Sequence, residues 1–293
     1  MPPLTRPAGT APEEIEFVPQ EPTRWLVPKL LALIGVQVAL STKFAEFFDR
    51  RDAHTGVLAH LTEATHASAK PGGGKHDGAN RWSMLETEQG FDFTGAEELW
   101  LDYVADSGDG FDATTTIASL AARDTLTLPS PAGQGRAGPH PTEAGAVLVL
   151  GGDQAYPFAT MQEYRNRLVG PFRSALPWTW RPRWLFAIPG NHDWYDGLAS
   201  FVKQLQGRWI GGWRTTQTRS YFALALPYNW HLWAVDVALG TDIDTGQLDY
   251  FEERADALKP GAQIVLCSAK PTWITPSTTI PPRPTYSSTS NAP

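Results

Sequence analysis

Short apolar runs alternate with amphipathic segments over the central and C-terminal parts of this chain. Val147–Leu150 and Trp184–Ile188 are continuous apolar runs, which are typical of strands buried on both faces of a parallel sheet. Runs of this kind and alternating runs predict strands at 99–105, 147–150, 184–188, 220–226, 231–237 and 263–267. Apolar residues at helical spacing predict helices at 113–123, 161–176, 197–206 and 247–258. Strands that alternate with helices indicate a layered α/β domain over residues 97–273.

The two ends of the chain have a different pattern. Residues 1–22 are rich in Pro and Glu without periodicity, so we expect a disordered leader. Residues 23–96 read as a helical N-terminal region with a Gly-rich loop, in which 23–51 has apolar residues at helical spacing. Residues 274–293 are mostly Pro, Ser and Thr, and we expect a disordered tail there.

Composition narrows the classes of protein. The net charge of −7 argues against a dedicated nucleic-acid binder, which is usually basic. The N-terminus lacks the basic and apolar regions of a signal peptide, and the single cysteine, Cys267, excludes an intramolecular disulfide, so we expect a cytoplasmic protein. Residues 26–40 are the most apolar segment, but they are shorter than the roughly 20 residues of a membrane span. They predict a packed helix, with weak association at a membrane surface, as in a peripheral membrane protein, as the alternative.

Polar clusters with adjacent glycines follow three of the predicted strands. These clusters are 106–112, Asp153 and Asn191–Asp193. Open α/β sheets build their sites beyond the carboxyl ends of parallel strands, so we expect these side chains to converge. Carboxylate, amide and imidazole groups bind divalent metals such as Mn, Fe or Zn. Two metals about 3.5–4 Å apart can activate a water and clamp a phosphoryl group, which points to hydrolysis of a phosphate ester.

The motifs resemble those of the calcineurin-like metallophosphoesterases. Gly152–Asp153 and Gly190–Asp193 look like the second and third motifs of that family, at a similar spacing. Asp106–Gly108 stands in place of the first motif, although the family usually has Asp-x-His there. Purple acid phosphatases have a similar Asp-x-Gly, paired with a Gly-Asp-x-x-Tyr that Gly152–Tyr156 matches. The resemblance implies a layered α/β/β/α sandwich.

The resemblance also implies a role for each matching residue. Asp106 would bind the first metal, Asp153 would bridge two metals, and Asn191 would bind the second. His192 would contact the phosphate and protonate or polarise the leaving oxygen, with Asp193 orienting it. The substrate would be a phosphorylated small molecule or another phosphoester.

Five further residues have alternative interpretations. Tyr156 is either a metal ligand or a packing or hydrogen-bonding neighbour. Asp109 or Asp112 could replace Asp106 as a ligand, although the favoured interpretation of Asp112 is the cap of the following helix. Arg208 and Arg214 could bind an anionic substrate or could be solvated arginines of an aromatic connector.

The C-terminal motifs of the family are missing. Ala269 stands where the fourth motif has a His, and no Gly-His-x-His follows. We therefore expect a sandwich that is incomplete at its C-terminal end. The chain is either a truncated product, or it binds one metal weakly, or it recruits other groups as ligands. The first hypothesis is a metal-dependent phosphoesterase. The alternative is a catalytically impaired or regulatory remnant of the same fold.

Overall fold

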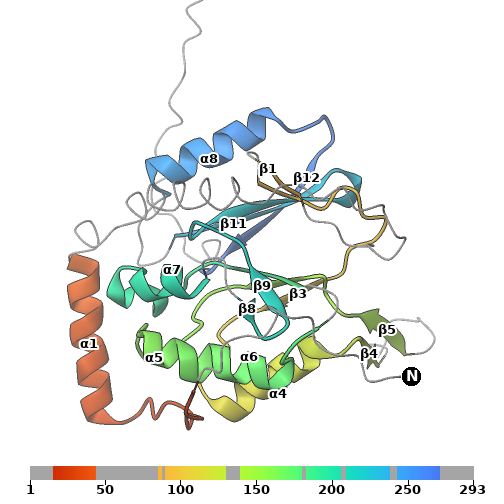
Figure 1. Ribbon diagram of the computed structural model, residues 1–293. Coiled ribbons are helices and arrows are strands. Elements are labelled where there is room, and N and C mark those ends of the chain that lie inside the picture. The colour runs from red at the N-terminus through yellow and green to blue at the C-terminus, as the bar shows by residue number, and fades with distance from the viewer. Residues whose placement is uncertain are drawn as a thin grey trace, which may run out of the picture.

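A computed structural model describes residues 16–43, 85–87, 90–129, 139–179, 183–205, 209–237 and 243–270. Helices combine with parallel and antiparallel strands, so the chain is an α/β protein. Two sheets lie face to face, and helices cover the outer face of each (Figure 1). The resulting order of layers is helices, sheet, sheet, helix.

The first sheet contains the strands that follow the expected βαβ pattern. Its order is β3 (Leu101–Val104), β6 (Val147–Leu150), β7 (Arg183–Ala187), β9 (Trp213–Thr215) and β8 (Trp209–Ile210). Adjacent strands from β3 to β9 are parallel, and only β8 is antiparallel to its neighbour. The carboxyl ends of β3, β6 and β7 therefore meet at one edge of this sheet.

Strand β6 shows why its sequence is apolar throughout. Val147 and Val149 face the core between the two sheets, whereas Leu148 and Leu150 face the helical layer. All four side chains are buried. Successive strand residues point to opposite faces, so a strand covered on both sides needs an unbroken apolar run.

The second sheet extends further toward the N-terminus than we expected. Its order is β1 (Leu85–Thr87), β2 (Gly90–Asp92), β10 (Phe222–Leu226), β11 (Trp230–Val235) and β12 (Gln263–Ser268). Since β2 pairs with β10, residues before 97 also contribute a strand to this sheet. A two-stranded antiparallel pair, β4 (Thr125–Leu128) and β5 (His140–Glu143), was also not predicted. Strands of two to four residues are too short to show a period.

The outer face of the first sheet is covered by four α-helices and a π-helical turn. These are α4 (Phe111–Ala122), α5 (Met161–Tyr164), the π-turn η1 (Arg165–Val169), α6 (Gly170–Ala175) and α7 (Ala199–Leu205). The helix expected at 161–176 is thus present but interrupted by η1. The N-cap of α4 is Gly110, so Asp112 lies in the first turn and is not the cap. Helix α8 (Thr245–Asp256) covers the second sheet.

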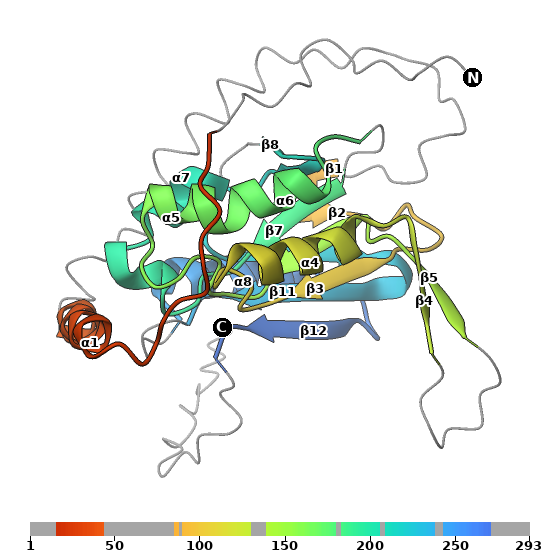
Figure 2. The same cartoon turned by 90° about the horizontal axis from the view of Figure 1, so that it is seen from below.

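The segment before the first helix is bound to the body of the protein. Residues 16–22, which we expected to belong to a disordered leader, cross over the helical layer (Figure 2). Helix α1 (Pro28–Lys43) begins after the expected start at residue 23, and the expected continuation over 44–51 lies outside the described residues. No helix in the described ranges is long and apolar enough to cross a membrane. The predictions of a disordered leader over residues 1–15, of a Gly-rich loop and of a disordered tail at 274–293 concern segments outside the described residues.

Candidate metal-binding site

Three loops meet at the carboxyl edge of the first sheet. Asp106 follows β3, Asp153 follows β6, and Gly190 begins the Gly-Asn-His-Asp turn after β7. The backbone nitrogen of Asp106 donates a hydrogen bond of 3.0 Å to the oxygen of Gly152. A Cβ atom on Gly190 would lie 2.1 Å from Asp153 Oδ1, so only glycine allows this close approach. The structure thus brings the three predicted clusters together.

Asp106 and Asp153 share an uncommon backbone conformation. Their φ angles are 55° and 53°, in the left-handed region. Asp tolerates this region better than most residues, but it still carries strain. Such strain persists where the surrounding structure imposes it, and it concentrates at functional sites.

The hydroxyl group of Tyr156 joins the two carboxylates. Its oxygen lies 2.9 Å from Asp106 Oδ1 and 3.0 Å from Asp153 Oδ2, so its single proton can be donated to either. Burial raises the pKa of Tyr156, and the charges of Asp153 and Asp106 raise it further. Burial also raises the pKa of Asp153, against the opposing effect of the His192 backbone N–H. A cation among these three oxygens would favour their charged forms.

His192 is held through its backbone and through one ring nitrogen. Its backbone N–H donates to Asp153 Oδ1 at 2.9 Å. Its Nδ1 lies 2.9 Å from the Pro157 carbonyl oxygen, which can only accept, so Nδ1 carries a proton. In this tautomer Nε2 is the ring nitrogen that can accept a hydrogen bond.

Asp193 does not orient the His192 ring as the family resemblance implied. It is fully buried beneath the turn and accepts hydrogen bonds from the backbone of Gly190 (2.8 Å) and Gln154 (3.3 Å) and from the Tyr164 hydroxyl. The Pro157 carbonyl occupies the place beside Nδ1 instead. Burial, followed by the charge of Asp153, raises the pKa of Asp193 to about 8. Its role here is to hold two site loops together.

Asn191 lies at the exposed side of the site. Its amide Nδ2 donates to the Tyr195 hydroxyl at 3.2 Å, which leaves Oδ1 as the atom for a metal. Gln37 of α1 donates to the backbone oxygen of Tyr195 at 2.7 Å. The turn that carries Asn191 is therefore tied to the N-terminal helix.

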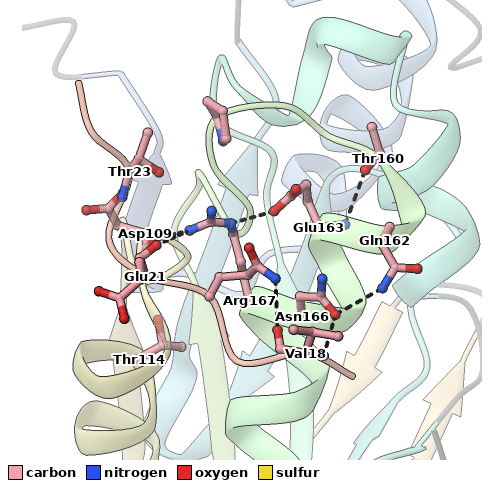
Figure 3. Close-up of polar contacts among 12 residues, drawn as sticks. Val18, Glu21, Thr23, Asp109, Thr114, Thr160, Gln162, Glu163, Asn166 and Arg167 are labelled. Carbon is pink, nitrogen blue, oxygen red and sulfur yellow. Dashed lines mark hydrogen bonds and ion pairs between the residues drawn. The ribbon is translucent and has the colours of Figure 1, made fainter. Parts of the chain in front are cut away.

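Residues 16–27, which we call the strap, are anchored through Asp109, Asn166 and Arg167 (Figure 3). Val18 N donates to Asn166 Oδ1 at 2.9 Å, and Thr23 N donates to Asp109 Oδ1 at 3.1 Å. Arg167 donates to the backbone oxygens of Glu21 and Asp109. Asp109 therefore anchors the strap in this structure, which does not favour it as a replacement for Asp106.

The strap places Trp25 against the site. Its ring lies 5.3 Å from that of Tyr156 and 5.6 Å from that of His192. The ring of Tyr195 lies 4.9 Å from His192, so three aromatic side chains surround the imidazole. Sequence analysis missed Trp25, because no local pattern relates it to residues after β6 and β7.

The structure does not place Arg214 near the site, although the sequence suggested Arg208 and Arg214 as substrate-binding residues. Arg214 packs over the ring of Trp184 at 5.4 Å, and the two residues are paired in β9 and β7. Trp184 lies near the amino end of β7, whereas the site follows its carboxyl end. Arg214 is thus at the opposite end of the sheet, and Arg208 lies outside the described residues.

The donors that converge are mainly oxygens. Within the described ranges, no three His, Cys, Asp or Glu side chains gather in a way that could hold a metal. Asp106, Asp153 and the Tyr156 phenol nevertheless present oxygens within hydrogen-bonding distance of one another. Oxygen donors of this kind are those that hard divalent cations prefer. Scans against family models, curated proteins and solved structures found no match to this chain.

Proposed function

We propose that this chain is a metal-dependent phosphoesterase of the calcineurin-like type, with the layered sandwich of that family. The observation that carries the proposal is the convergence of Asp106, Asp153 and Tyr156 beside His192 at the carboxyl edge of a parallel sheet. Separate strands deliver these groups to one point, as open α/β sheets do for their ligands.

In this proposal the oxygens of Asp106, Asp153, Tyr156 and Asn191 would hold divalent cations at a dinuclear site, either complete or incomplete. When bound, such a cation lowers the pKa of a coordinated water and neutralises charge on a phosphoryl group. His192 Nε2 delivers a proton to the leaving oxygen, because its Nδ1 proton is retained by Pro157. Asp193 holds the loops after β6 and β7 together through its hydrogen bonds to the backbone of Gln154 and Gly190.

The test is hydrolysis of bis-p-nitrophenyl phosphate and p-nitrophenyl phosphate by the full chain, with Mn, Fe or Zn. We expect turnover that is lost in Asp153→Asn. This substitution keeps the shape of the side chain and removes its charge. Turnover no higher than that of Asp153→Asn with every metal would rule out the enzyme.

A second candidate, a catalytically impaired or regulatory form of the fold, is favoured by the end of β12. A Cβ on Gly152 would lie 2.9 Å from the Cβ of Ala269, so Ala269 lies beside the loop that carries Asp153. A residue at this position could reach the site, but a methyl group cannot bind a metal. Metal analysis separates the candidates, since tight stoichiometric binding of two metals excludes this one.

A further inference from the structure

Helix α1 turns apolar side chains toward solvent. Leu33 is 53% exposed, Val36 57% and Leu40 47%, and Leu26, just before the helix, is 90% exposed. Single exposed apolar residues are ordinary, but a contiguous group on one element marks an interaction surface. Figure 1 shows α1 at the margin of the molecule, outside the four layers.

One narrow side of α1 holds it to the protein. Leu30, Ile34, Gln37 and Ser41 recur at helical spacing and are the less exposed positions of the helix. Gln37 donates to the Tyr195 backbone oxygen at 2.7 Å. The orientation of α1 is therefore set by its contact with the site turn, and its other sides remain outward.

The outward face combines apolar and basic residues. Lys29, Leu33, Val36 and Leu40 follow the spacing of a single helical face. Residues 22–45 contain no Asp or Glu but include Arg24, Lys29 and Lys43, whereas the whole chain has a net charge of −7. This local reversal of charge favours an anionic partner. A second copy seated on the same face would bring like charges together.

We propose that α1 docks this protein onto the surface of an anionic lipid bilayer. Leu33, Val36 and Leu40 enter the boundary between headgroups and acyl chains, and Arg24 and Lys29 contact the headgroups. The helix lies in the plane of the surface, since it is not long enough to cross. Its contact through Gln37 then holds the site turn within about one helix diameter, roughly 10 Å, of the lipid.

The test is flotation of the full chain with vesicles, and it does not depend on phosphoester hydrolysis. We expect the chain to float with vesicles of phosphatidylcholine and phosphatidylserine and to float less with phosphatidylcholine alone. Val36→Glu should reduce the bound fraction about tenfold. Lys29→Gln should weaken binding about fivefold, because one basic residue near an anionic surface contributes about 1 kcal/mol of binding free energy.

Leu248→Glu on α8 is the matched control for Val36→Glu, because Leu248 is 48% exposed. Lys259→Gln, also at an exposed position, is the control for Lys29→Gln. Both controls should float as the wild type does, and equal thermal midpoints would show that the variants fold. The proposal is overturned if the wild type does not float, or if Val36→Glu floats equally well. It is also overturned if Val36→Glu instead dissociates a lipid-free dimer.

Discussion

Replacing Gly190 with alanine should disrupt the contact on which the candidate site depends. A Cβ at this position would lie 2.1 Å from Asp153 Oδ1 and 2.5 Å from the Asp153 backbone nitrogen. Ordinary contact for a Cβ begins at 3.4 Å, so one of the two loops has to move by about 1 Å. Rotation of the Asp153 side chain cannot relieve the clash, since a backbone atom takes part in it.

Two effects of Gly190→Ala follow from this displacement. Overpacking of this kind costs about 1–3 kcal/mol of folding free energy, which lowers the thermal midpoint. A shift of about 1 Å between Asp153 and His192 should also reduce turnover about 100-fold. We would measure thermal unfolding, Mn affinity by calorimetric titration, and hydrolysis of bis-p-nitrophenyl phosphate.

Gly95→Ala is the matched control, because Gly95 has no atom within 4 Å of an added Cβ. It should leave the midpoint, Mn affinity and turnover at their wild-type values. If Gly190→Ala behaves as Gly95→Ala does in unfolding and in metal affinity, the loops after β6 and β7 do not meet as described, and the reasoning fails.

Four further predictions concern single side chains. The raised pKa of Asp193 means that the folded state keeps a proton that the unfolded state releases above about pH 4, so Asp193 should lower stability as pH rises from about 4 to about 8; thermal unfolding against pH should show this slope, and Asp193→Asn should make it shallower, with the contribution of Asp153 remaining. Tyr156→Phe keeps the ring but removes the bridging oxygen, so we expect Mn affinity to fall at least tenfold by calorimetry, while Tyr228→Phe at an exposed position should not change it. Arg214→Ala should leave kcat/KM for p-nitrophenyl phosphate unchanged, because Arg214 lies at the opposite end of the sheet; a large loss would contradict this placement. Asn166→Ala removes the acceptor of the Val18 N–H, which is worth about 1 kcal/mol, so amide exchange at Val18 should accelerate about fivefold, and an unchanged rate would show that this anchor does not hold the strap.

The central strands could be predicted because burial on both faces requires an apolar residue at every position, which is visible in a short stretch of sequence. A strand such as β6, covered on both faces, has to be apolar at every position, and Val147–Leu150 meets that condition. The shorter strands β1, β2, β8 and β9 could not be predicted in this way. Each has two or three residues, and their place in the sheets depends on partners supplied by the rest of the fold.

The sequence could also predict that the site residues lie at the same edge of the sheet, but it could not predict which atoms contact one another. Asp106, Asp153 and His192 follow parallel strands, and this alone brings them to one edge. Which group faces His192 Nδ1 depended on how the loop after Asp153 folds, and the structure places Pro157 there instead of Asp193. Side-chain direction in a loop is decided by packing, which spacing along the chain does not report.

By itself, the sequence determined the class of fold, the principal strands and the residues at their carboxyl ends, because these depend on short-range apolar periodicity. Only the tertiary structure decided that Trp25 lies against His192, that Asp109 anchors the strap, and that the outward face of α1 is apolar and basic. These features join segments far apart in the chain, such as Val18 and Asn166, 148 positions away. Contacts of that range follow from the packing of whole layers, and no local pattern encodes them.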